Sequence, residues 1–497
     1  MPKHAVLLLG TIAVLGGVHL ATLREGQEWG DDFGLYVAHA RNIAEGRPYD
    51  DTGYLYNPQN AVVSPRSYPP VFPLLLAPMY RLFGLDLAAM KAFVVLLFMA
   101  ALVVLGTLFR KRLPFPYALA CLVLFAVNPY VWQQKDRLLS ETPFMLFAYL
   151  ALLLAERAAE ANQTRTRCVA WGLVAGFTAY LAFGTRTVGV VLLPSILGVE
   201  LLRRRRLGMA SLSILTAFAV CVGVQKYFLP SNGSASYLDQ LVFDPLRFAR
   251  IGLSLVKGMG DFVANGYSGA ACAFLYGCLL VLAGTGYVAR LRNGPTVYEL
   301  FIAFNFMLLT VWPAAESNQR FLLPLLPLFF LYVGEGLCLL RQRLPRPTEA
   351  LAVAATLAVL VSNACLYTRL DFGPIRDGVS TPEAIALFDW IRASTSPKNA
   401  FLFQKPKTIA LYTRRAAMAP HKPAGDEHLL QLLQSKGITH IIVGPSSSDA
   451  AFRASRKVLE PFIERHADSF EKVYVNPEFR VYRLREAGLG DRVLNPS

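Results

Sequence analysis

Two adjacent acids, Asp31 and Asp32, stand in the segment Trp29–Tyr36, just after the first hydrophobic stretch of the chain. A carboxylate can take a proton from an attacking hydroxyl as a general base, and a second one can orient it or help to hold a cation. Acids at the end of a membrane span are costly to desolvate and are often functional. The alternative is structural, because Asp favours the first turn of a helix. Both interpretations stay open, since a carboxylate at a helix start is also rigidly placed.

The helix that these acids would begin places Asp32, Tyr36 and His39 on one face, at i, i+4 and i+7. His39 is therefore a candidate second polar contact to a substrate, with exposure to solvent as the alternative. Further along, the triplet Tyr68-Pro69-Pro70 predicts a rigid turn that folds this loop back over the membrane into a helix beginning at Val71. A simple helix entry is the alternative interpretation of the same prolines.

Four more charged residues fall at the same ends of predicted spans. Glu141 needs a partner or a cavity there, and an ion pair with Arg137 four residues earlier is the structural alternative. Arg320 and Arg186 are candidate ligands of a lipid phosphate, because guanidinium binds phosphate oxygens in a bidentate way. The other candidates for binding the substrate or its lipid phosphate are Glu141, Arg137, Tyr68 and His39. For Arg320 the alternative is a salt bridge at the rim with Glu316.

The elements that must position these residues are membrane helices. Of the 497 residues, 54% are hydrophobic and 17% charged, against about 25% charged in typical soluble domains. The apolar residues fall in blocks that predict about eleven spans. These spans are 5–23, 88–109, 114–132, 139–156, 168–184, 187–202, 209–229, 266–289, 297–313, 321–340 and 349–367. The net charge of +15 lies largely in short clusters between spans, which is a topology signal and argues against a nucleic-acid partner.

The distribution of basic residues predicts the orientation. Alternate loops carry clusters such as Arg110-Lys111-Arg112 and Arg203–Arg206, whereas the intervening short loops hold only scattered cations. Because positive loops face the cytoplasm, the N-terminus is expected there, and the acidic first loop, residues 24–87, is expected outside.

Residues 370–497 change character and form a second predicted unit, a small extracytoplasmic α/β domain after a transmembrane domain of residues 1–369. Thr381 begins a helix, residues 429–435 form a second helix, residues 400–403 and 439–443 form strands, and residues 472–484 contain a closing hairpin. No catalytic constellation is recognised in this unit.

Four motifs in their order along the chain resemble those of the GT-C membrane glycosyltransferases. The closest likeness is to the bacterial relatives of dolichyl-phosphate-mannose protein mannosyltransferases, which are glycosyltransferase family 39-like, and of the lipid A aminoarabinose transferase. The motifs are Trp29-Gly30-Asp31-Asp32, Tyr68-Pro69-Pro70, Ser140-Glu141-Thr142-Pro143-Phe144 and Arg320-Phe321-Leu322-Leu323-Pro324. The resemblance covers about residues 1–370 and implies a mainly α, polytopic transmembrane helical bundle of the GT-C type in a bacterial inner membrane.

The resemblance also implies roles. A polyprenyl-phosphate sugar would be the donor, Asp31 the catalytic base, Asp32 the second acid, and Glu141 and Arg320 substrate-binding residues. One departure matters: the aminoarabinose branch has a lysine before the paired prolines, where this chain has Tyr68. A phosphate-binding cation is therefore expected to be missing at this place, and that branch's donor is not assigned.

The predicted reaction is attack of an acceptor hydroxyl on the anomeric carbon, with inversion, while Arg320, Arg186 or a divalent metal ion held by Asp31, Asp32 or Glu141 stabilises the leaving phosphate. The acceptor is a glycan, a lipid or a protein. Two other classes stay open: a transporter or flippase for polyprenyl-linked glycans, which would carry polar sites near the bilayer midplane, and a non-catalytic sensor, which would carry a ligand pocket in residues 370–497.

Overall fold

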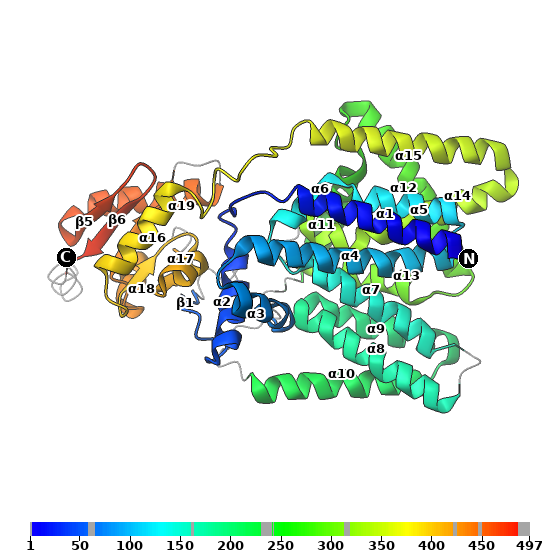
Figure 1. Cartoon of the computed structure of the whole chain (residues 1–497), viewed down its shortest axis with the longest axis horizontal. Helices are drawn as coiled ribbons and strands as arrows, with labels where there is room; N and C mark the ends of the chain where they lie inside the picture. The colour runs from blue at the N-terminus through cyan, green and yellow to red at the C-terminus, as the bar shows by residue number, and fades with distance from the viewer. Residues whose placement is uncertain are drawn as a thin grey trace.

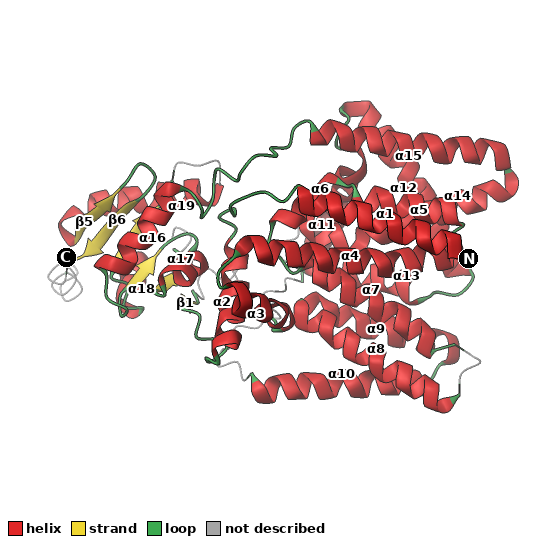
Figure 2. Ribbon diagram, in the orientation of Figure 1, coloured by secondary structure: helices red, strands yellow, loops and turns green. Residues whose placement is uncertain are grey.

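The structure is a computed structural model that describes residues 2–57, 65–160, 164–229, 241, 243–312, 319–420, 425–445 and 450–485. Figure 1 shows an elongated molecule with a helical body at one end, a smaller domain at the other, and the first loop between them. Strands are drawn only in and beside the smaller domain (Figure 2).

The helical body contains the segments that the sequence predicts to cross the membrane. Its helices are α1 (Pro2–Ala21), α4 (Leu87–Arg112), α5 (Phe115–Ala126), α6 (Pro129–Gln133), α7 (Glu141–Ala158), α8 (Arg165–Thr185), α9 (Leu192–Arg204), α10 (Met209–Phe228), α12 (Gly269–Arg292), α13 (Val297–Val311), α14 (Leu326–Arg343) and α15 (Pro345–Tyr367), with 3₁₀ segments η2 (Gln134–Asp136), η3 (Thr187–Val191) and η6 (Gln319–Leu325). The chain is thus a mainly helical polytopic membrane protein.

Fewer helices than predicted qualify as membrane spans by their length and composition. Seven helices in the described part of the chain are long and apolar enough to cross a membrane, or eight if the bent pair of α5 and residues 129–136 is one span. The other three predicted spans are helical, but α9 has 13 residues and α13 has 15, against the roughly 20 that a crossing needs. The third, α7, has 18 residues and carries Glu141, Glu156 and Arg157.

Three further helices lie outside these spans. They are α2 (Asp31–Glu45), α3 (Val71–Phe83) and α11 (Pro245–Ala264). The first two confirm the prediction that a helix follows the acids and that another starts after Pro70. The third lies between the predicted spans 209–229 and 266–289, and its basic residues Arg247, Arg250 and Lys257 make it too polar to be predicted as a span.

The C-terminal domain is a mixed sheet covered by helices. The sheet order is β1-β3-β2-β4-β6-β5, parallel from β1 to β4 and antiparallel beyond it. Its strands are β1 (Tyr54–Leu55), β2 (Ala400–Leu402), β3 (Ala416–Met418), β4 (His440–Val443), β5 (Phe470–Val475) and β6 (Arg480–Leu484), and its helices are α16 (Pro382–Ser394), α17 (Pro406–Thr413), α18 (Asp426–Ser435) and α19 (Ala450–Arg465), with a 3₁₀ turn η7 (Ala467–Ser469). Sequence reasoning found the helices at 382 and 429 and four of the strands; it missed α17, β3 and α19.

One strand of this sheet comes from the first loop. Strand β1 pairs with β3, with Tyr54 opposite Ala417 and Leu55 opposite Met418. The sheet of the C-terminal domain therefore includes a strand from before the predicted boundary at residue 370.

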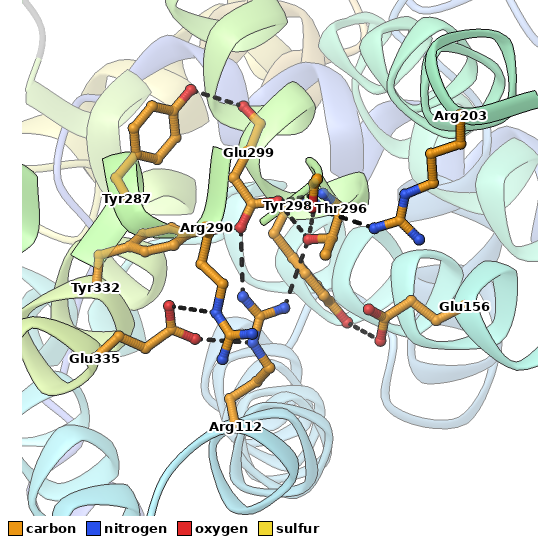
Figure 3. Close-up of polar contacts among 11 residues, drawn as sticks. Arg112, Glu156, Arg203, Tyr287, Arg290, Thr296, Tyr298, Glu299, Tyr332 and Glu335 are labelled. Carbon is orange, nitrogen blue, oxygen red and sulfur yellow. Dashed lines mark hydrogen bonds and ion pairs between the residues drawn. The ribbon is translucent and has the colours of Figure 1, made fainter. Parts of the chain in front are cut away.

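A buried ion network ties the body together at the end away from the C-terminal domain (Figure 3). Arg112 of α4 donates from Nε to Glu335 at 2.8 Å and lies 3.3 Å from Glu299, and Arg290 also donates to Glu335 at 2.9 Å. Tyr332 and Thr296 donate further hydrogen bonds to Glu299. Glu299 is fully buried, so each of its oxygens depends on these partners.

We expect Glu299→Gln to destabilise the protein by about 3–5 kcal/mol, because it leaves Arg112 buried with one of its two acids gone. The measurement is thermal unfolding of the purified protein in detergent. Glu349→Gln is the matched control, since Glu349 pairs with Arg341 at 3.0 Å on the exposed surface, where such a pair is worth roughly 1 kcal/mol or less. Equal melting temperatures for the two variants would contradict the assignment of the network as structural.

Candidate active site

The Asp31 carboxylate caps a helix of the C-terminal domain. Its Oδ1 accepts hydrogen bonds from the backbone N–H groups of Lys407 at 3.1 Å and Thr408 at 3.3 Å, in the first turn of α17. Its own helix, α2, begins after Gly30 without a side-chain cap. Because Asp31 also stands in the first turn of α2, the helix-start interpretation is confirmed, and its carboxylate caps a second helix, α17, as well.

Lys407 is the site residue that sequence reasoning missed. Its Nζ lies 3.4 Å from Asp31 Oδ2, 3.4 Å from Asp32 Oδ1 and 3.0 Å from Tyr68 Oη. The side chain is only 1% exposed. The expectation that a cation is missing at Tyr68 is thus wrong, because the C-terminal domain supplies one. The sequence signals were Pro406, which is favourable at the first position of a helix, and two acids that need a partner.

Tyr68 is the shared neighbour of the predicted polar face of α2. Its hydroxyl donates to Asp32 Oδ1 at 2.6 Å, its ring lies 4.6 Å from that of Tyr36, and its backbone N–H donates to His39 Nε2 at 3.3 Å. The prediction that Asp32, Tyr36 and His39 share a face is confirmed.

His39 holds the loop together and does not line an open site. It is fully buried, stacks on Tyr49 and donates from Nδ1 to the Tyr49 carbonyl at 2.7 Å. Burial lowers the pKa of His39 to about 4, so the ring is neutral, with its proton on Nδ1 and Nε2 free to accept from Tyr68. This burial contradicts the interpretation of His39 as a solvated residue, and its contact with a substrate stays a prediction.

Two arginines join the acids into one cluster. Arg320 Nη2 lies 2.9 Å from Asp32 Oδ2, and Arg320 Nε lies 3.6 Å from Glu141 Oε1. Arg186 Nη1 lies 2.6 Å from the same Glu141 oxygen and donates to Ser140 Oγ at 3.1 Å. The structure thus brings together five residues that the sequence singled out, from α2, α7, the end of α8 and η6.

Arg137 takes a different partner from the one expected. Its guanidinium lies 3.2 Å from Glu28, in the loop before α2. Glu141 is instead claimed by Arg186 and Arg320, because it is 1% exposed and points into the cluster. Glu316, the alternative partner of Arg320, lies outside the described residues.

The environments of Asp31 and Asp32 move their pKa values in opposite directions. Burial raises the pKa of Asp31, although Lys407 opposes this shift. Burial acts on Asp32 too, but Arg320 and Lys407 outweigh it and hold the pKa of Asp32 below its usual range. Two neighbouring carboxyl groups with diverging pKa values are typical of a site in which one moves a proton and the other stays charged.

The residues present do not fit a divalent cation. Asp31, Asp32 and Glu141 each have a lysine or arginine nitrogen within 3.4 Å. These cations already neutralise the negative charge of the carboxylates that would attract a metal ion. Across the described ranges, with their gaps, there is no group of three or more His, Cys, Asp or Glu side chains placed to hold a metal. The predicted metal ion therefore has no support in this geometry.

A cavity of about 510 Å³ adjoins the cluster and shares Arg320 with it. It lies between η2, α11 and η6, and its polar lining includes Arg137, Lys257, Asp261 and Gln319. Its volume is within the range of small-molecule sites, roughly 300–1,000 Å³. Asp32 and Arg320 are the most exposed members of the cluster, at 24% and 25%, so the ionic site is most open where Arg320 borders this cavity.

The fold matches solved membrane glycosyltransferases over nearly the whole chain. ArnT from Cupriavidus metallidurans bound to undecaprenyl phosphate matches with a TM-score of 0.56 and 12% identity, over 98% of this chain and 99% of that one. The Archaeoglobus fulgidus oligosaccharyltransferase in complex with Zn and sulfate matches with a TM-score of 0.59 and 14% identity, over 98% and 74%. The chain has the GT-C fold.

Sequence comparison agrees with this assignment. The family model described as dolichyl-phosphate-mannose-protein mannosyltransferase matches residues 67–225, from the Tyr68-Pro69-Pro70 motif to the end of α10. No curated protein sequence matches the chain. The resemblance to GT-C glycosyltransferases inferred from four short motifs is confirmed.

In this GT-C chain the C-terminal domain is locked to the first loop by Trp29. The indole is 2% exposed and is surrounded edge-on by four phenylalanines of that domain at 5.7–6.1 Å between ring centres: Phe388, Phe403, Phe452 and Phe479. A tryptophan just after a span is expected at the membrane interface, but Trp29 is a core residue of the C-terminal domain. The site therefore sits at a rigid junction.

Truncation of this residue, Trp29→Ala, should destabilise the junction by about 3–5 kcal/mol, because a large cavity opens among the phenylalanines. Limited proteolysis of the purified protein should then cut the C-terminal domain faster. Trp171→Ala serves as the control, since Trp171 lies partly exposed on α8. The same rate of proteolysis in both variants would show that the indole does not hold the domain.

Proposed function

We propose that this protein is an integral membrane glycosyltransferase that moves a sugar from a polyprenyl-phosphate donor to an acceptor hydroxyl, with inversion at the anomeric carbon. The reaction takes place on the outer face of a bacterial inner membrane, with the N-terminus in the cytoplasm and about eleven segments of the helical body embedded in the bilayer. The single observation that carries the proposal is the cluster of Asp31, Asp32, Glu141, Arg186 and Arg320 beside a polar cavity.

The proton is taken by Asp31. Its Oδ2 makes no hydrogen bond within the described residues, and its raised pKa suits a base better than the strongly ion-paired Asp32. As the acceptor oxygen bonds to the anomeric carbon, its proton passes to Asp31 and the bond from that carbon to the phosphate oxygen breaks. The electron pair leaves with the polyprenyl phosphate.

The negative charge that grows on the leaving phosphate is met by arginines. Arg320 and Arg186 converge on Glu141 and flank the ring of Phe321 at 5.5 and 5.7 Å. Arg320 Nε makes no hydrogen bond inside the described structure, so it has a donor to offer a phosphate oxygen. Fixed cations in a partly dehydrated site stabilise such charge without reorganising.

Proteins of the same fold that bind lipid phosphates support a lipid-phosphate donor. The ArnT structure contains bound undecaprenyl phosphate. Archaeoglobus fulgidus AglB in complex with an inhibitory peptide and a dolichol-phosphate matches with a TM-score of 0.54 and 13% identity, over 99% of this chain and 75% of that one. The sugar and the acceptor class, which is a glycan, a lipid or a protein, are left to the assay.

We expect Asp31→Asn to lower sugar transfer by about 10²–10⁴-fold, because it removes the base and keeps the shape. The assay measures label moving from a panel of radiolabelled polyprenyl-phosphate sugars to acceptors in membranes. Asp51→Asn is the matched control, since Asp51 is an exposed acid of the same loop, paired with Arg47. Full activity of Asp31→Asn would exclude Asp31 as the base, and donor binding without transfer by the wild type would favour the flippase or sensor alternatives.

The acid side of the pH profile should report Asp31. Only the ionised carboxylate accepts a proton, so transfer is full above its pKa and falls about tenfold per unit below it. Because burial raises that pKa above the ordinary value of 3.8, activity should begin to fall at a higher pH than a solvated Asp would give. An acid limb at or below 3.8 would contradict this environment.

A further inference from the structure

We propose that the C-terminal domain completes the active site, with Lys407 as a positioning residue that keeps Asp31 and Asp32 charged side by side and orients Tyr68 against Asp32. The inference rests on the proposed function and adds to it a residue that comes from another domain. Its basis is geometric: one ammonium group lies within 3.4 Å of both carboxylates and 3.0 Å from the Tyr68 hydroxyl, and is almost wholly shielded from water.

The approach of α17 to α2 is built for this contact. A side chain at Gly34, one turn after the acids, would place its Cβ 3.0 Å from the Lys407 carbonyl carbon and oxygen and 3.1 Å from the Thr408 nitrogen. Such spacing is tighter than ordinary contact with backbone atoms, so only glycine lets the first turn of α17 lie against α2. The same turn delivers its backbone N–H groups to Asp31 and its ammonium group to both acids.

Electrostatics explains why the cation is needed. Two adjacent carboxylates out of water disfavour each other's ionisation, and one of them takes up a proton unless a positive charge lies between them. Arg320 contacts Asp32 but not Asp31, so Lys407 is the cation that Asp31 contacts directly. The charged groups that act on the two carboxylates, besides each other, are Lys407, Lys405 and Arg320. The Lys407 ammonium lies 5.6 Å from the ring centre of Tyr54 and 5.1 Å from that of Tyr68.

Tyr68 carries the second part of the role. Its hydroxyl accepts from the Lys407 ammonium, so its own proton is directed at Asp32 Oδ1, 2.6 Å away. This arrangement holds one Asp32 oxygen with Tyr68 and leaves the other with Arg320. One lysine from a remote segment, Lys407, thus keeps the base Asp31 ionised and helps to fix the position of Arg320 through Tyr68 and Asp32.

The first test is the pH profile of sugar transfer by the full-length chain. Lys407→Met removes the charge but keeps the backbone N–H that caps Asp31, so the acid limb should move to higher pH by roughly one to three units. Lys407→Arg should bring it back toward the wild-type position. The control is Lys398→Met, an exposed lysine of the same domain, whose profile should match the wild type.

A second variant tests the contact of the Lys407 ammonium with the two acids without removing a charged group. Gly34→Ala should push the first turn of α17 away and move the acid limb in the same direction as Lys407→Met. Because both changes act through the ammonium group, the double variant should shift little further than Lys407→Met alone. Lower activity with an unmoved acid limb in both variants would show that Lys407 is only a structural contact and would overturn the proposal.

The same titration can be followed without turnover, which separates this inference from the proposed function. Because the folded-state pKa of Asp31 is raised, its protonation contributes stability below the unfolded pKa, and this contribution is lost as pH rises through the folded pKa. In Lys407→Met that loss in melting temperature should extend to higher pH, and adding Asp31→Asn should abolish it. If the wild type transfers no sugar but Lys407→Met shows this shift in melting temperature, the proposed function is refuted and the role of Lys407 is kept. If the wild type is active but the melting temperature of Lys407→Met has the same pH dependence as that of the wild type, the role of Lys407 is refuted and the proposed function is kept.

Discussion

The pair of carboxylates at the start of α2 is the constraint around which the rest of the site is arranged. Carboxylates removed from water are stable only when cations and donors replace the lost hydration. Here the replacement comes from segments far apart in sequence: Lys407 and the first turn of α17, Arg320 at η6, and the Tyr68 hydroxyl later in the first loop. Glu141 and Arg186 extend the chain of charges into α7 and the end of α8.

This constraint also decides how the two units of the protein meet. A lysine can serve two acids only if its domain is held in a fixed position, since a shift of about an ångström or two weakens both contacts. The fixing elements are apolar and regular. Trp29 inserts among four phenylalanines, and β1 adds a strand of the first loop to the sheet of the C-terminal domain. The charged contacts then fall at the rim of a core that is shared by both units.

Sequence reasoning reached the parts of this arrangement that local signals encode. Hydrophobic blocks located the helices, the short motifs located Asp31, Asp32, Glu141 and Arg320, and the end of a predicted span located Arg186; the structure brings these five residues together. Lys407 escaped because its partner lies 376 residues earlier, and a single lysine before an ordinary helix carries no local signal. The alternative pairing of Arg137 with Glu141 and the solvated interpretation of His39 are wrong for the same reason: the partner of each, Glu28 and Tyr49, is set by how the first loop folds. In the described part of the chain, seven or eight helices qualify as spans by length and composition, against about eleven predicted, because α9 and α13 are short and α7 is partly charged.

The two ion clusters at opposite ends of the body differ in how completely their buried charges are hydrogen-bonded. In the network of Figure 3, Glu299 and Glu335 are both nearly inaccessible, and every oxygen accepts from an arginine, a tyrosine or a threonine. In the cluster around α2, Asp31 Oδ2, Glu141 Oε2 and Arg320 Nε make no hydrogen bond among the described residues, and a cavity opens beside Arg320. Buried charges with unused hydrogen-bonding capacity are unfavourable in a resting protein. They become favourable when a ligand with a hydroxyl and a phosphate completes them, so the incomplete cluster, and not the fully satisfied one, is where the chemistry is expected.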